Sequence, residues 1–103
     1  MTRSSGILLP VSALPGPCGI GDLGTAAREF IDFLAAAGQR YWQILPLNPP
    51  DSAHSPYLSA STFAGSTDLL SPEPFMARGA LAADEVRSVD WGGDPMRVDY
   101  GRV

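Results

Sequence analysis

The stretch that decides the fold is residues 25–47, TAAREFIDFLAAAGQRYWQILPL. In its first half, Thr25 to Ala37, apolar side chains recur every three or four residues and charged ones fall on the other faces, which predicts an amphipathic helix. Gly38 follows, and glycine commonly ends a helix because it adopts a positive φ without strain. The second half, Tyr41 to Leu47, is aromatic and aliphatic with little polar alternation, which predicts a strand covered on both faces.

A second strand is expected upstream, because Ile7 to Leu9 is a short apolar run stopped by proline and predicts a brief buried strand. Strand, helix and strand in this order form a βαβ unit. Its two βα connections are long, residues 10–24 and 48–67, whereas the helix and the second strand are joined only by residues 38–40. Ligands bind at the carboxyl ends of the strands in α/β folds, so the two long loops are expected to carry the functional residues.

The rest of the chain predicts only short helices. Ser71, Pro72 and Glu73 have the character of an N-cap, an N1 proline and a first-turn acid, for a helix that Gly79 ends. A further helical turn is expected at Ala82 to Val86. Two parallel strands with one long helix leave both sheet edges unpaired and one face uncovered, and a complete barrel takes about 250 residues. The sequence therefore predicts the first part of a larger fold and no complete domain.

Composition narrows the class of protein. The 103 residues are 45% hydrophobic and carry a formal charge of −4, so no basic surface for nucleic acid is expected and an uncharged ligand fits better. The single cysteine, Cys18, excludes an internal disulfide, and with one histidine a protein-only zinc site is implausible. No apolar run has the length of a signal sequence or a membrane span, which predicts a cytoplasmic protein without a membrane partner.

The segment GIGDLG, residues 19–24, matches the G-x-G-x-x-G pattern of dinucleotide-binding loops. That fold needs its first glycine directly after the strand and an acid at the end of the second strand. Here Gly19 follows the first strand by about ten residues, and the second strand ends at Leu47 and Asn48 without a carboxylate. The nucleotide-binding alternative is disfavoured, and it would require dinucleotide binding that a bulky residue at Gly21 weakens.

Four segments in order resemble the N-terminal part of the 4-α-glucanotransferases, the amylomaltases or disproportionating enzymes of glycoside hydrolase family 77. They are SSGILL (4–9), LPGPCGIGDLG (14–24), FIDFLAAAGQRYWQILPLNP (30–49) and HSPYLSASTFAGS (54–66). Four collinear segments are a more specific signal than any one of them. A further segment, VDYGRV (98–103), is similar to the start of a family helix.

The resemblance implies that residues 1–103 are the N-terminal fragment of a (β/α)₈ TIM barrel, consisting of its first βαβ unit and the loop and helices that follow. It implies an enzyme that is cytoplasmic in bacteria and needs no organic cofactor or metal. Such an enzyme cleaves an α-1,4 bond in a maltooligosaccharide or starch-type α-glucan and transfers the glucan segment to the 4-hydroxyl of another sugar. In this retaining chemistry a carboxylate attacks the anomeric carbon, a carboxylic acid protonates the leaving oxygen, and the acceptor sugar takes the place of water.

The resemblance assigns substrate contacts but no catalytic residue. The family's nucleophilic Asp, acid/base Glu and stabilising Asp come from later strands, so the chain is expected to be inactive alone. Ser55 and Tyr57 match the family's serine and tyrosine that contact the glucan near the scissile bond, and a phenol suits a pyranose because it has an apolar face and a hydroxyl. His54 is a further candidate for binding a sugar. On residue chemistry alone, Tyr57 packing at the barrel rim and Ser55 bonding a turn stay open alternatives.

Other residues are expected to be structural or mark a departure from the family. Tyr41 and Trp42 are expected in the core, Asp22 at a turn, and Cys18 as a half-buried thiol. Many members have G-Y-G-D before SPY, where this chain has residues 51–54, DSAH, so a tyrosine associated with a second glucan site is absent. A free-standing carbohydrate-binding or interaction module that keeps the SPY loop is the alternative hypothesis. The sequence leaves the oligomeric state open.

Overall fold

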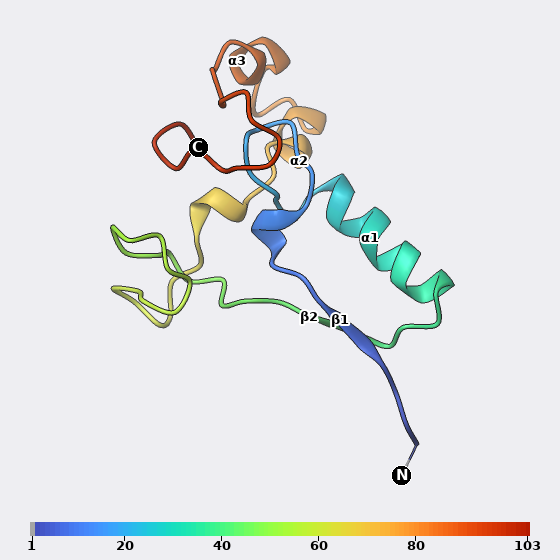
Figure 1. Cartoon of the computed structure of the whole chain (residues 1–103). Helices are drawn as coiled ribbons and strands as arrows, with labels where there is room; N and C mark the ends of the chain where they lie inside the picture. Colours follow the sequence, from blue (N-terminus) through green and yellow to red (C-terminus); the bar gives the residue numbers. More distant parts are fainter. Residues whose placement is uncertain (1) are drawn as a thin grey trace.

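The computed structural model describes residues 2–103, which form a βαβ unit followed by long loops and short helices (Figure 1). The two strands are parallel, and Gly6 pairs with Tyr41 and Leu8 with Gln43. The α/β class predicted from the sequence is therefore correct. In chain order the elements are β1 (Gly6–Leu8), the 3-10 helix η1 (Val11–Ala13), α1 (Thr25–Ala36), β2 (Tyr41–Gln43), the 3-10 helix η2 (Thr67–Leu69), α2 (Glu73–Ala77) and α3 (Ala83–Arg87).

Helix α1 ends as its glycine predicts. Gly38 has a φ of +72°, and its backbone N–H donates to the Ala35 carbonyl at 3.1 Å. The Gln39 N–H donates to the Leu34 carbonyl at 2.9 Å. These two bonds satisfy carbonyls that a helix end otherwise leaves without partners. The chain can then turn directly into β2, which explains the short αβ connection.

A small core joins α1, the sheet and the first βα loop. Val11, Leu14 and Ala27 are buried together, and Phe30 and Trp42 pack against them. The rings of Phe30 and Trp42 meet edge to face with centroids 5.1 Å apart, a favoured aromatic geometry. The Trp42 indole N–H donates to the Leu9 carbonyl at 2.8 Å. Trp42 is therefore a core residue, as predicted, and it fixes β2 to the end of β1.

Both strands are more exposed than predicted, and β2 is also shorter. The expectation of a covered strand from Tyr41 to Leu47 is wrong, because β2 stops at Gln43 and Tyr41 is 64% exposed. The expected buried strand at Ile7 to Leu9 lies one residue earlier, and Leu8 is 56% exposed. The physical reason is the small sheet. Among residues 2–103 nothing pairs with its outer edges, so apolar side chains that suit a covered strand lie in solvent.

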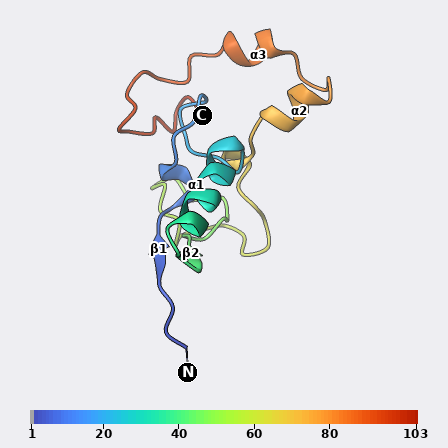
Figure 2. The ribbon, with the colours of Figure 1, turned by 90° about the vertical axis from the view of Figure 1, so that its right-hand side faces the viewer.

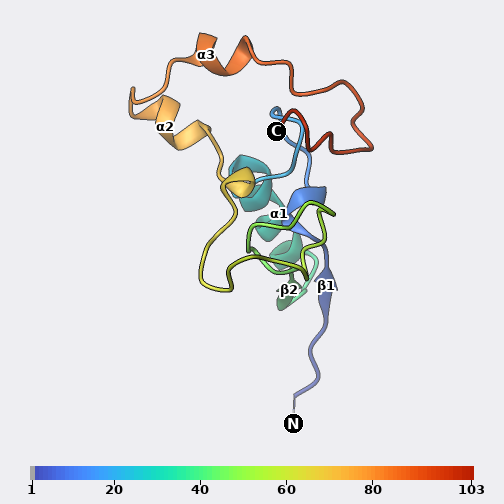
Figure 3. The same ribbon diagram turned by 90° about the vertical axis from the view of Figure 1, so that its left-hand side faces the viewer.

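The short helices lie beyond the amino-terminal end of α1, on the side to which the strands' carboxyl ends point (Figures 2 and 3). Helix α2 begins at Glu73 with Pro72 at its N-cap, one residue later than the predicted Ser71 N-cap, although Ser71 Oγ accepts the Glu73 N–H at 3.3 Å. Gly79 follows the helix with a φ of +73°, so the predicted end signal is confirmed. The radius of gyration is 15.2 Å, whereas a compact chain of this length has about 13 Å. The molecule is therefore open. Within residues 2–103 no helix is long and apolar enough to cross a membrane.

Candidate functional site

The two long βα loops meet at the carboxyl ends of the strands and form a cleft there. The first loop contributes residues 10–12 and Ile20, and the second contributes residues 45–48 with Pro50, His54 and Pro56. Ser66, Asp68, Leu69 and Tyr100 complete the lining. Most of these side chains are apolar, with a few polar groups among them, which is the usual character of a small-molecule site.

Asn48 organises the second loop. Its side-chain amide Nδ2 donates to three backbone carbonyls, those of Ser61 at 3.2 Å, Thr62 at 2.9 Å and Ala64 at 3.0 Å. The Ser66 N–H donates to the Leu47 carbonyl at 2.7 Å and closes the loop. One side chain therefore holds the returning half of residues 44–66 beside the end of β2. The loop projects from the βαβ unit as two narrow lobes (Figure 1).

The lobe that carries the SPY segment has its own closing bonds. The Asp51 N–H donates to the Leu58 carbonyl at 2.9 Å, which joins the two sides of the lobe. The His54 N–H donates to the Asp51 carbonyl at 2.9 Å, and the Ala53 N–H donates to Asp51 Oδ1 at 3.0 Å. The lobe is thus an ordered turn built on Asp51, and it carries Ser55 and Tyr57.

The three residues predicted to contact substrate lie together on this lobe, but they differ in burial and in whether they line the cleft. His54 lines the cleft. Ser55 is half-buried, and its Oγ accepts the Tyr57 N–H at 3.4 Å, the turn contact that chemistry alone had suggested. The Tyr57 side chain is 72% exposed and does not line the cleft. Residues 2–103 therefore do not pack around the Tyr57 ring.

The imidazole of His54 stacks on the phenol ring of Tyr100. The ring centroids are 4.3 Å apart and the planes differ by 7°. His54 also has a φ of +55°, which is uncommon for any residue other than glycine. Reasoning from the sequence missed Tyr100 as part of the site. Its only signal was the similarity of VDYGRV to a family segment, because a contact between residues 46 positions apart leaves no local pattern.

Other atoms of the protein lie close to the backbone at the glycines of GIGDLG. A methyl group at Gly21 would overlap the Val11 carbonyl oxygen, and one at Gly19 would overlap the Trp91 carbonyl oxygen. At Gly24 it would meet the Ser71 hydroxyl. These glycines are needed for close backbone packing, which accounts for them without a bound pyrophosphate. The nucleotide-binding alternative has no support in this geometry.

The carboxylates nearest to the first loop cap α1. Glu73 Oε2 accepts both the backbone N–H and the hydroxyl of Thr25, at 2.9 and 2.6 Å, and these bonds lower the pKa of Glu73. Asp22 Oδ1 accepts the Gly24 N–H at 2.9 Å, the turn role predicted for it, while burial raises the pKa of Asp22. Both side chains thus have structural roles at the helix start.

Cys18 and the acidic residues supply no metal site in the part of the chain that the structure describes. Cys18 is 6% exposed, so it is more deeply buried than the half-buried thiol expected from its loop position. Burial raises the pKa of the Cys18 thiol, which favours the protonated form, a poor nucleophile and metal ligand. Across residues 2–103 no group of three or more His, Cys, Asp or Glu side chains has the geometry to hold a metal ion.

Comparisons with known proteins identify relatives over nearly the whole chain. A family model described as 4-alpha-glucanotransferase matches residues 9–103. The chain is 48% identical over 101 residues to the 4-alpha-glucanotransferase of Thermus thermophilus and 45% identical over 101 residues to that of Streptococcus pneumoniae serotype 4. These matches cover 98% of this chain but 19% and 20% of the two relatives, so the chain spans about a fifth of their length.

A solved structure shows the same arrangement. The amylomaltase from Streptococcus agalactiae, in complex with acarbose, superimposes with a TM-score of 0.94 and 40% sequence identity. The match covers 97% of this chain and 20% of that one. The strands, the helix, both long loops and the short helices therefore all have counterparts in that protein.

Proposed function

The chain belongs to the 4-alpha-glucanotransferases of glycoside hydrolase family 77, and from this membership we infer that it supplies the first βαβ unit and a glucan-contacting loop to an enzyme of that activity. The observation that carries the proposal is the TM-score of 0.94 over 97% of the chain. A match of that extent includes the irregular loops around the cleft as well as the common βαβ unit. Since such loops carry function on α/β scaffolds, their likeness supports a shared activity.

The reaction we propose is the transfer of an α-1,4-glucan segment between maltooligosaccharides or starch-type glucans with retention. The amylomaltase that the chain resembles was solved in complex with acarbose, which supports a glucan-binding cleft here. Ser55 and Tyr57 would contact the glucan near the scissile bond. The exposed Tyr57 ring can lie against a pyranose face, and His54 in the cleft wall can hydrogen-bond a sugar hydroxyl.

The two carboxyl groups that retaining chemistry requires would come from outside residues 1–103. Asp22 and Glu73 cap α1, and Asp51 builds the SPY lobe. Asp90 and Asp99 pair with the Arg102 guanidinium. These acids already have structural partners. The role of this chain would be to bind and orient the sugar, with no organic cofactor, metal, nucleic acid or membrane taking part, in a cytoplasmic enzyme.

The fold we propose for the complete enzyme is a (β/α)₈ barrel in which this chain is the N-terminal part. The exposed apolar side chains support it, because they lie where further barrel elements would cover them. Leu8 and Tyr41 lie on the sheet, and Ile31 and Phe33 on α1. Each fully covered side chain of this size contributes about 1.5–3 kcal/mol. A free-standing carbohydrate-binding module would leave these surfaces in water, so that alternative is disfavoured.

The experiment that tests the proposal is a hybrid enzyme. Residues 1–103 replace the matching fifth of the Thermus thermophilus relative, and glucose release from maltotriose is measured for the hybrid and for the chain alone. We expect the hybrid to disproportionate maltotriose and the isolated chain to be inactive. In the hybrid, Tyr57→Ala should lower kcat/KM by about tenfold or more, because the variant loses an aromatic contact and a hydroxyl contact with the glucan. Activity of the isolated chain, or full activity of Tyr57→Ala, contradicts the proposal.

A further inference from the structure

The SPY lobe depends on a backbone conformation that needs support. His54, directly before Ser55, has a φ of +55°. A residue other than glycine in this region costs free energy, and it persists only when surrounding contacts hold it. The His54 N–H bond to the Asp51 carbonyl is one such contact, and it belongs to the lobe itself. The stack with Tyr100, at 4.3 Å and 7°, is the contact that comes from outside the lobe.

Tyr100 is held firmly enough to serve as that support. It lies in a turn in which the Arg102 N–H donates to the Asp99 carbonyl at 2.9 Å and the Gly101 N–H donates to Asp99 Oδ1 at 3.1 Å. The Arg102 guanidinium pairs with Asp90 and with Asp99, the latter at 3.1 Å. These two hydrogen bonds and two ion pairs hold the turn that carries Tyr100.

We propose that Tyr100 is a positioning residue for the glucan-contacting lobe, acting through its ring stack with His54. The inference rests on the proposed function, because it concerns how Ser55 and Tyr57 are presented to the glucan. Rotation of the His54 backbone to negative φ would reorient Ser55 and strain the bond that the Leu58 N–H donates to the Ser55 carbonyl at 3.2 Å. The stack therefore sets the direction in which the tip of the lobe points.

The test uses the hybrid enzyme with Tyr100→Ala, His54→Ala and Tyr100→Phe. Loss of the stack should lower kcat/KM for maltotriose about 2- to 12-fold, the range that an aromatic pair supports. His54→Ala also removes the proposed sugar contact, so its effect should be at least as large, and Tyr100→Ala should add little in the His54→Ala background because the stack is already lost there. Tyr100→Phe retains the ring and should lower kcat/KM less than Tyr100→Ala does.

The Tyr57→Ala background distinguishes a positioning role of Tyr100 from a general effect of Tyr100 on stability. If Tyr100 positions the lobe, Tyr100→Ala should add little once the Tyr57 ring is absent, whereas general destabilisation should add in full. A Tyr100→Ala hybrid with unchanged kcat/KM, or with an effect that adds fully to that of Tyr57→Ala, overturns the inference while leaving the proposed function intact.

A second readout does not require turnover. Chymotrypsin cleavage after Tyr57, followed by mass spectrometry in the same hybrids, should accelerate in Tyr100→Ala and His54→Ala and stay unchanged in Tyr100→Phe. Equal cleavage rates in all four proteins would contradict the positioning role even if the hybrid had no activity. An inactive hybrid with the expected cleavage pattern would contradict the proposed function and support the role of the stack.

Discussion

At the scale of single residues, Asn48 shows how one side chain can define a binding loop. Its amide donates to three carbonyls of residues 61–64, and its two N–H groups offer one more donor than a hydroxyl would. The loop has no regular secondary structure before η2. The hydrogen bonds from the Asn48 side chain therefore take the place of the backbone–backbone hydrogen bonds that a strand or helix would have.

Asn48→Asp is expected to destabilise the loop by about 1–3 kcal/mol, because a carboxylate has no donor and would face three carbonyl oxygens. Thermal unfolding and kcat/KM of the hybrid enzyme measure the effect. Thr62→Ala is the matched control, since Thr62 contributes only its backbone carbonyl to this network. Equal stability of Asn48→Asp and Thr62→Ala would show that the three bonds do not hold the loop.

At the scale of elements, α1 starts on a carboxylate that is distant in sequence. Glu73, on α2, accepts two hydrogen bonds from Thr25 and thereby joins the two helices. Its pKa is lowered, first by the Thr25 hydroxyl and then by the Thr25 N–H. A lowered folded-state pKa gives stability that is present above the unfolded pKa and is lost as the pH falls through the folded value.

The start of α1 should therefore loosen below about pH 4.5, the ordinary pKa of Glu73. Hydrogen–deuterium exchange of the peptide 22–30 in the hybrid, corrected for the intrinsic rate, should show protection that declines on acidification. In Glu73→Gln the acceptor oxygen remains but the charge is lost, so this decline should be weaker. The pKa of Asp22 is raised, so its titration changes the stability in the opposite direction. Comparing the unmodified hybrid with Glu73→Gln isolates the contribution of Glu73. Identical pH profiles would contradict the account.

The elements also show what sequence can predict here. The ends of α1 and α2 follow from Gly38, Ser71 and Gly79, whose effects are local, and these were predicted within a residue. The exposure of Tyr41 was not, because burial depends on neighbours that are absent from residues 2–103. For the candidate site, the sequence located the SPY lobe through the family resemblance. It missed Asn48 and Tyr100, whose partners lie 13 to 46 residues away.

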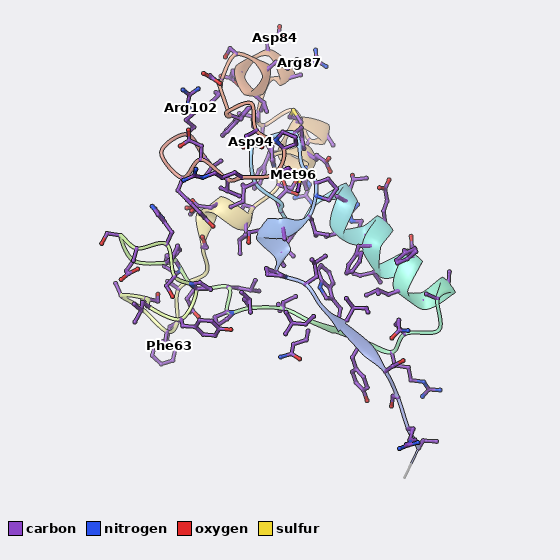
Figure 4. The ribbon with its side chains drawn as sticks, in the orientation of Figure 1. Phe63, Asp84, Arg87, Asp94, Met96 and Arg102 are labelled. Carbon is purple, nitrogen blue, oxygen red and sulfur yellow. The ribbon has the colours of Figure 1, made fainter. Side chains whose placement is uncertain are left out.

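At the scale of the whole molecule, the chain has an open shape and leaves large apolar side chains exposed to solvent. Phe63 is fully exposed at the second loop, where its side chain projects from the ribbon (Figure 4), and Met96 is 90% exposed. They add to the exposed apolar positions on the sheet and on α1, among them Leu8 and Phe33.

The isolated chain should therefore bind 8-anilinonaphthalene-1-sulfonate strongly and associate as its concentration rises, because water-exposed apolar surface and free strand edges favour both. Dye fluorescence and sedimentation measure this. The hybrid enzyme is the control, since its remaining four-fifths should cover the same side chains. Weak dye binding and a sharp unfolding transition for the isolated chain would favour an independent module instead.

Glucose release from maltotriose by the hybrid enzyme tests the central claim most directly. If residues 1–103 supply the first βαβ unit and the substrate-contacting loop of a 4-alpha-glucanotransferase, the hybrid should retain activity within about tenfold of the Thermus thermophilus enzyme, a change of about 1.4 kcal/mol in transition-state binding. Longer glucans should appear together with the glucose, as transfer requires. A hybrid that unfolds cooperatively but releases no glucose would contradict the account.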